Sequence, residues 1–206
     1  SKSSNKQYQS DITYTEHGVP HIKADNYGSL GYGIGYVQAK DNMCTLSEQI
    51  LKVKGEKSRH FGAGPGSIDL YNDIGYKALD YPGEAKQLYK SISPTYRELL
   101  EGYVAGFNRS LSERTSPQDY PSPCRGAEWV KKITTNDLLA YHLDLAGLAS
   151  SRNFLAAIAA AKPPTASANI VSNVQLDAEK VFSSKGIGSN GWAIGSERSE
   201  DGSSLL

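Results

Sequence analysis

The segment Lys185–Gly195, "KGIGSNGWAIG", decides how this chain is interpreted, because a serine stands directly after Gly-Ile-Gly and directly before Asn-Gly-Trp. Asn-Gly is the dipeptide that most favours a type I′ hairpin turn, so Ser189-Asn190-Gly191 can be read as an ordinary turn. That turn needs an apolar strand before it, and the preceding "SSKGIG" supplies none. The alternative is that the bond between Gly188 and Ser189 is broken, so that Ser189 becomes a new N-terminus.

A serine at a new N-terminus combines two catalytic groups in one residue. Its hydroxyl is a nucleophile, and its α-amine, with a pKa of about 7.7–8.0, can accept the hydroxyl proton directly or through a water. In the uncut chain the same hydroxyl can attack the carbonyl of Gly188, since glycine tolerates the strained backbone that this step requires. A chain cut before Ser189 would therefore carry its own nucleophile and base and would need no cofactor for catalysis, while the hairpin turn stays the alternative.

The sequence on either side of Ser189 differs in character. Residues 163–188 are small, polar and aperiodic, which is typical of a linker. After Ser189, "NGWAIG" and "SSLL" flank "SERSEDG" as two short strands around a turn, and the second strand is cut off by the end of the chain. Because such a strand would leave an open sheet edge, we interpret residues 189–206 as the beginning of a longer region.

The first part of the chain shows a change of periodicity. Residues 11–15 alternate and lead through a Gly-Val-Pro turn into a second short strand. Residues 27–62 have helical spacing in two stretches that break near Asp41-Asn42. Glycine weakens a helix by about 1 kcal/mol relative to alanine, so glycines here indicate close packing against a neighbour. The glycines concerned are Gly31, Gly33 and Gly35.

The second half of the chain contains two further helical regions. Ser93 can cap the first of them, with Pro94 at the first helical position. A proline-rich stretch without periodicity follows, anchored by Trp129. Thr134 then stands three residues before Asp137, which resembles a capping box and predicts another helix that continues until the prolines at 163 and 164.

Metal, nucleic-acid and membrane functions find no support in the sequence. His17 and His21 have the spacing of zinc ligands on a helix, but Gly18 and Pro20 between them prevent a helix, so we assign a turn. His142 lies on an apolar stripe and is assigned as a hydrogen-bonded core residue. The 22 basic and 22 acidic residues cancel without charged runs, which argues against a nucleic-acid partner. No apolar run approaches the roughly 20 residues of a membrane span.

The two cysteines leave two alternatives open. Cys44 and Cys124 can form one disulfide that closes a long loop, or they can be two buried thiols. No Cys-x-x-Cys pair or Cys/His cluster indicates zinc. The cysteine content by itself therefore does not settle the redox compartment.

Three motifs in order resemble the penicillin acylase family of N-terminal-nucleophile hydrolases. "TEHGVPHIKADNYGSLGYGIGYVQAKDNM" is similar to the family's amino-terminal signature, "GYVAGFN" to its Tyr-x-x-Gly-x-Asn helix, and "GSNGWAIG" to the junction where the nucleophile follows glycine. "CRGAEWVKKIT" further resembles the branch that acts on acyl-homoserine lactones and on lipopeptides such as aculeacin. The resemblance covers nearly the whole chain.

The resemblance implies an α+β fold, an αββα sandwich assembled from one precursor. Residues 1–162 would be a mainly helical α chain with short N-terminal strands, 163–188 a spacer removed on maturation, and 189–206 the start of a long β chain. The rest of the β chain would be the partner and would supply the oxyanion hole, so this fragment alone would be inactive. The substrate would be a small acyl amide of the penicillin or acyl-homoserine lactone type, and the location periplasmic or secreted.

Two expectations about binding residues complete this reading. Leu145, Ala146, Leu148 and Ala149 are the candidates for one wall of the acyl pocket, with plain core packing as the alternative. The family often binds a structural calcium through an α-chain glutamate, but "GLASSRNFLAAI" in this region has no acidic residue, so no calcium ligand is assigned. The competing hypothesis for the whole chain is a non-catalytic helical binding module in which Ser189-Asn190-Gly191 is a hairpin turn.

Overall fold

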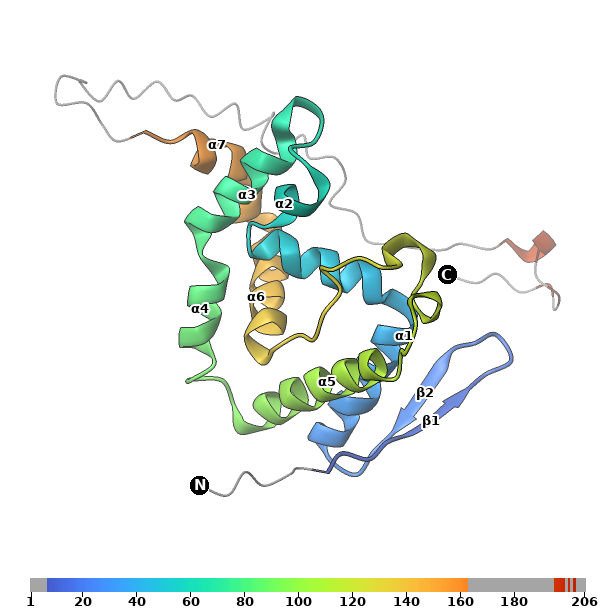
Figure 1. Ribbon diagram of the computed structural model, residues 1–206. Helices are drawn as coiled ribbons and strands as arrows, with labels where there is room; N and C mark the ends of the chain where they lie inside the picture. Colours follow the sequence, from blue (N-terminus) through green and yellow to red (C-terminus); the bar gives the residue numbers. More distant parts are fainter. Residues whose placement is uncertain (1–6, 163–194, 199, 201, 203–206) are drawn as a thin grey trace. The chain divides into compact units, whose positions relative to one another are not determined.

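The computed structural model describes residues 7–162, 195–198, 200 and 202. The chain divides into two units, residues 1–162 and 163–206. The described part of the first unit is mainly helical, with one two-stranded sheet, as Figure 1 shows. Its strands and α-helices are β1 (Asp11–Tyr14), β2 (Pro20–Lys23), α1 (Tyr27–Val53), α2 (Lys57–Phe61), α3 (Ile68–Leu79), α4 (Tyr81–Leu88), α5 (Pro94–Ser112), α6 (Thr135–Ala146) and α7 (Leu155–Ala160).

Short 3₁₀ turns complete the described residues. In the first unit they are η1 (Pro65–Ser67), η2 (Pro117–Asp119), η3 (Ser122–Cys124), η4 (Gly147–Ala149) and η5 (Ser151–Phe154). In the second unit Ser196–Arg198 forms the turn η6, within the segment expected to be a turn. The proposed linker at 163–188, Ser189 and most of the two strands expected after it lie outside the described residues.

The N-terminal hairpin has the two strands that the alternation predicts. β1 and β2 pair antiparallel with Ile12 opposite Ile22. Gly18 in the connecting turn has φ of +76°, a left-handed conformation that glycine adopts without strain. His17 and His21 are both exposed, on the turn and on β2, and no helix brings them together.

The helices α1 and α5 make the most extensive contact between two elements of the described chain (Figure 1). A β-carbon on Gly31 or Gly35 of α1 would collide with the backbone of α5. A β-carbon on Gly102 or Gly106 of α5 would collide with the backbone of α1 in the same way. The two backbones therefore touch directly, which confirms the expected close packing. Gly33 differs, because the atoms nearest to its β-carbon would be side-chain atoms of Ile22 in β2 and of Ser10, which precedes β1.

Replacing Gly35 by alanine is expected to destabilise the protein far more than replacing Gly33. The new methyl group at 35 would strike the main chain of Tyr103, which cannot move without separating the helices, and such overpacking costs about 3 kcal/mol. At 33 only Ile22 and Ser10 side-chain atoms must shift, and the higher helix propensity of alanine returns about 1 kcal/mol. Urea unfolding of both variants measures the difference; equal midpoints would contradict direct backbone contact.

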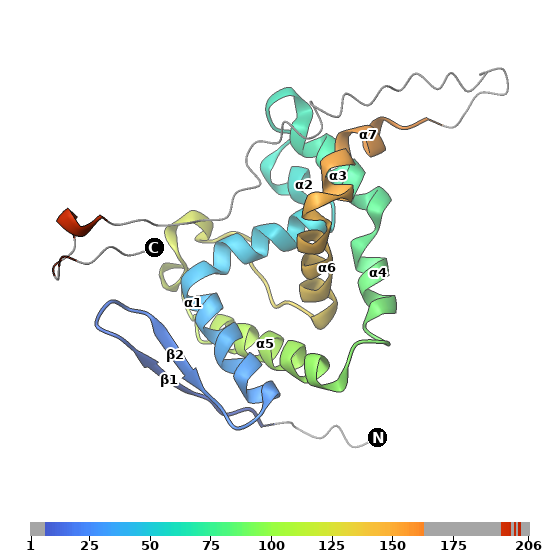
Figure 2. The ribbon, with the colours of Figure 1, turned by 180° about the vertical axis from the view of Figure 1, so that it is seen from behind.

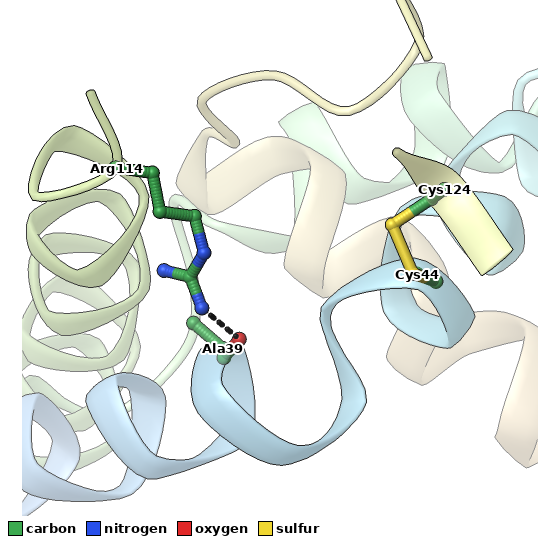
Figure 3. Close-up of a disulfide and its surroundings, with 4 residues drawn as sticks. All are labelled: Ala39, Cys44, Arg114 and Cys124. Carbon is green, nitrogen blue, oxygen red and sulfur yellow. Dashed lines mark hydrogen bonds between the residues drawn. A yellow bond between two sulfur atoms is a disulfide. The ribbon is translucent and has the colours of Figure 1, made fainter. Parts of the chain in front are cut away.

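The predicted break in the first long helix is a kink at Asn42, whose φ and ψ are −133° and 26°. Before the kink, the Arg114 guanidinium donates a hydrogen bond of 3.3 Å to the carbonyl of Ala39 (Figure 3). After the kink, Cys44 is bonded to Cys124, with the two Cα atoms 5.5 Å apart (Figure 3). Of the two alternatives for the cysteines, the disulfide is the correct one. The bend in α1 is thus tied on one side to the residue that follows the end of α5 and on the other side to η3.

Two helices were not anticipated from the sequence. α3 and α4 are separated by Asp80, which has φ of +48° and whose carboxylate caps α4 by accepting a 3.1 Å hydrogen bond from the Gly83 N–H. The sequence did not identify α3 as a core helix, because the residues that it buries do not form an apolar stripe. Many of its large apolar side chains point outward instead. These are Ile68, Leu70, Tyr71 and Ile74, each between 43% and 49% exposed.

The apolar core forms two clusters, and α5 contributes residues to both. The first lies between α1, α5 and the irregular stretch before α6, and its central members are Met43, Phe107, Cys124 and Ile133. The second lies between α3, α4, α5 and α6, and its central members are Tyr76, Leu100, Leu138 and Leu139. Figure 2 shows α3, α4 and α6 grouped together on one side of the unit. The α6 members of this second cluster, Leu138, Leu139 and Ala140, lie in the first half of the helix, ahead of the candidate pocket residues at its C-terminal end.

Candidate functional site

The catalytic and processing residues expected from the sequence, Ser189 and Gly188, lie outside the described residues. The site can therefore be built only from the residues proposed to line the acyl pocket. Leu145 and Ala146 are in the last turn of α6, and Leu148 follows in η4 with Ala149. Leu145 is 46% and Leu148 40% exposed, and Ala146 is exposed as well. Within the described residues these two leucines are therefore not part of the core, and their role as a pocket wall stays a prediction.

The N-terminus of α6 has the capping box that Thr134 and Asp137 predict. The Thr134 hydroxyl accepts a 3.1 Å hydrogen bond from the Asp137 N–H, and the Asp137 carboxylate accepts one of 2.8 Å from the Thr134 N–H. The same carboxylate pairs with Lys54 Nζ at 2.5 Å. The start of α6 is thus fixed to the end of α1.

The C-terminal end of α6 is held by a buried carboxylate. Asp144 is fully buried, its Oδ1 accepts a 2.8 Å hydrogen bond from the Tyr76 hydroxyl, and its Oδ2 lies 2.9 Å from Lys52 Nζ. Arg152 Nη1 lies 3.7 Å from the same Oδ2. Burial lowers the pKa of Lys52, an effect that Asp144 opposes, and burial together with Asp144 raises the pKa of Tyr76. Residues from α1, α3 and η5 therefore meet at one carboxylate.

The turns that follow α6 are anchored by further contacts. The Tyr81 hydroxyl and Ser151 Oγ are 2.9 Å apart. A β-carbon on Gly147 would collide with the Tyr81 hydroxyl, so a larger residue where η4 begins would force that side chain to shift. The segment that carries Leu145 and Leu148 is consequently held at both of its ends.

His142 is hydrogen-bonded, as expected, but it is half-buried and does not belong to either core cluster. Its Nδ1 lies 2.7 Å from the Tyr96 hydroxyl, and burial lowers the pKa of the imidazole, which favours the neutral ring at neutral pH. The sequence did not reveal Asp144, Lys52 or Tyr76 as a group. The signal available was a carboxylate placed among the apolar residues of α6, because a buried carboxylate needs a partner.

The residues after α6 do not fit a calcium site. Calcium in proteins takes six to eight oxygen ligands, mostly carboxylates and carbonyls. Residues 147–158 contain no acidic side chain, and the nearby Asp144 carboxylate is already engaged by Lys52 and Tyr76. Across the described ranges, no group of three or more His, Cys, Asp or Glu side chains is close enough to hold a metal ion.

Comparison with known proteins places this arrangement in a family. The chain is 37% identical to the acyl-homoserine lactone acylase PvdQ of Pseudomonas savastanoi, over 98% of this chain and 27% of that protein. It is 35% identical to the aculeacin-A acylase of Actinoplanes utahensis, over 97% of this chain and 27% of that protein. The chain thus spans about a quarter of the length of these relatives.

The fold comparison agrees with the sequence comparison. A penicillin G acylase from Alcaligenes faecalis matches with a TM-score of 0.61 at 21% identity, covering 69% of this chain and 75% of that chain. The mainly helical arrangement with its small sheet is therefore similar to the penicillin acylase fold. The sequence model of the penicillin amidase family matches residues 9–206, the junction at Ser189 included. The chain belongs to the penicillin amidase family.

Proposed function

We propose that this chain is the α-chain region and the first part of the β chain of an acylase that cleaves an acyl group from an amine. The observation that carries the proposal is the family match through residue 206, which includes the Gly-Ser-Asn-Gly-Trp junction. The acylases named above align with this chain over nearly its whole length. Ser189 is the proposed nucleophile, and the bond between Gly188 and Ser189 is the proposed processing site.

The proposed reaction uses Ser189 twice. First its hydroxyl attacks the carbonyl of Gly188, and the resulting ester is hydrolysed to free a serine N-terminus. Then the hydroxyl attacks the substrate amide while the α-amine accepts its proton, and the amine product leaves with that proton. The acyl ester that remains is hydrolysed by water, which restores the serine and releases a carboxylic acid.

The described part of the chain supports an apolar acyl group in the substrate. Leu145 and Leu148 present apolar surface at the end of α6, and pockets for aliphatic groups are lined by such residues. Two of the related proteins are named for acyl-homoserine lactones and for aculeacin A. We therefore favour a long aliphatic acyl chain over an aromatic acetyl group, and an acyl-homoserine lactone or lipopeptide over a penicillin.

The proposed partner is the remainder of the β chain, and the proposed location is periplasmic or secreted. The disulfide between Cys44 and Cys124 supports an oxidising compartment, where such bonds persist. Among the helices of the described residues, none combines the length and apolarity needed to cross a bilayer. We propose that catalysis needs no cofactor, since the α-amine of Ser189 supplies the base.

N-terminal sequencing and intact mass of the full-length gene product test the proposal. We expect two chains, the second beginning at Ser189, and hydrolysis of a dodecanoyl amide with release of its amine. A product that folds yet stays in one piece and hydrolyses no acyl amide would favour the competing hypothesis of a binding module with a turn at Ser189-Asn190-Gly191.

A further inference from the structure

Four side chains form a buried charged group that the proposed reaction does not use. This group, called here the Asp144 cluster, consists of Lys52, Tyr76, Asp144 and Arg152. The Asp144 side chain is 0% exposed, and those of Lys52 and Arg152 are 17% and 31% exposed. α6 carries two buried carboxylates, Asp137 and Asp144, and of these only Asp144 is fully buried.

A contribution to folding stability does not by itself explain the Asp144 cluster. Asp144 lies in the last turn of α6, where the partial negative charge of the helix end opposes a carboxylate. Burying an ion pair costs desolvation energy that its attraction roughly offsets, and an apolar residue of similar size is often as stable. What this buried carboxylate adds is position: its Oδ1 accepts a directed hydrogen bond from Tyr76, and the charge on its Oδ2 holds Lys52 and Arg152 close to it.

The contacts of Asp144 affect the position of the two exposed leucines, Leu145 and Leu148. Leu145 follows Asp144 directly, and Leu148 lies between the Asp144 cluster and the contact of Ser151 with Tyr81. Arg152 in η5 forms an ion pair with Asp144, so the turns that follow α6 are also attached to this carboxylate. The orientation of the backbone that carries both leucines is therefore determined by contacts to α1, α3 and α4.

We propose that the Asp144 cluster is a positioning device for the apolar wall formed by Leu145 and Leu148, and thereby sets which acyl-chain lengths are accepted. The inference rests on the proposed acylase function. Asp144 is fully buried and does not touch substrate; it acts through the two leucines. A wall displaced by about 1 Å changes the fit of a long chain more than that of a short one, because the long chain contacts more of it.

The test measures chain-length preference in the full-length protein. The ratio of kcat/KM for dodecanoyl p-nitroanilide to that for butanoyl p-nitroanilide is compared between the parent and Asp144→Asn. Asparagine keeps the size and an acceptor for Tyr76 but removes the charge that pairs with Lys52. We expect this ratio to fall about tenfold, mainly through a higher KM for the dodecanoyl substrate. The kcat for the butanoyl substrate and cleavage before Ser189 should persist.

The chain provides a matched control at the other end of the same helix. Asp137→Asn makes the same chemical change, removes a charge paired with Lys54, and weakens the capping box. It should lower the melting temperature and leave the kcat/KM ratio unchanged. Tyr76→Phe is a milder probe that removes one hydroxyl donor to Asp144, and it should shift the ratio in the same direction by a smaller factor.

The possible outcomes separate this inference from the proposed function. A parent enzyme inactive on both anilides overturns the acylase proposal, and the positioning role falls with it. If the parent is active and the kcat/KM ratio is unchanged in Asp144→Asn, only the positioning role is overturned. If Asp144→Asn does not fold, an unchanged ratio in Tyr76→Phe overturns the positioning role in the same way. An equal shift in Asp137→Asn also overturns it, because the effect would then follow from general destabilisation.

Discussion

Ser189→Ala should leave the full-length polypeptide in one piece and without amide-hydrolysing activity. Alanine has no hydroxyl to attack the carbonyl of Gly188, so the bond before residue 189 has no internal nucleophile. The α-amine also stays locked in a peptide bond and cannot act as a base. Loss of a catalytic serine lowers turnover on the order of 10⁶-fold in a well-studied hydrolase, and loss of processing adds to that effect. Intact mass and hydrolysis of a dodecanoyl anilide measure both results.

Two further variants make the Ser189 prediction specific. Ser184→Ala changes a serine in the same segment and should leave cleavage and activity unchanged. Ser189→Cys retains a nucleophile, and a thiol is intrinsically more reactive than a hydroxyl, so we expect it to be cleaved at the same bond. Cleavage of Ser189→Ala at the normal position would show that another group performs the cut, and the self-processing mechanism would be wrong.

Removal of the disulfide is the second change with a large expected effect. The bond closes a loop with a sequence separation of 80, and the chain-entropy relation gives about 4.5 kcal/mol of stabilisation for a loop of that size. Cys44 follows the kink of α1 and Cys124 lies 2% exposed in the first core cluster, so the cross-link joins two parts that pack together. We expect the variant Cys44→Ala/Cys124→Ala to unfold at a clearly lower urea concentration.

Reduction provides the control for the disulfide. Dithiothreitol should lower the urea midpoint of the parent toward that of the double variant and should not affect the double variant. The ring of Trp129 packs against that of Phe61 at an angle of 51°, with ring centroids 5.3 Å apart, so its fluorescence reports on the segment that the disulfide holds. A parent midpoint that is insensitive to dithiothreitol would contradict a disulfide that stabilises the folded chain.

Local signals in the sequence were sufficient for elements that depend on local interactions. The hairpin turn at Gly18, the cap at Ser93 and the capping box at Thr134 all involve atoms within a few residues of each other, and each is present in the structure. The break near Asn42 was also predicted correctly. The glycines Gly31 and Gly35 indicated close packing, but the partner helix α5 became known only from the fold.

Elements that depend on distant contacts were missed or left open. α3 and α4 were not predicted, because α3 exposes large apolar side chains and its buried residues include Asp73 and Tyr76, which do not form a simple apolar stripe. Asp73 instead accepts hydrogen bonds from the N–H groups of Lys57 and Ser58 at the start of α2. The state of the two cysteines could not be decided, since thiol pairing depends on distance in space.

The sequence by itself determined the family, the order of the motifs and the residue expected to be the nucleophile, because these depend on residue type and local spacing. Only the tertiary structure decided that Cys44 and Cys124 are joined, that Leu145 and Leu148 face outward, and that Asp144 meets Lys52 and Tyr76. The sequence alone does not reveal which residues a buried carboxylate contacts. Its partners are set by how helices from three parts of the chain pack, and burial then makes those contacts obligatory.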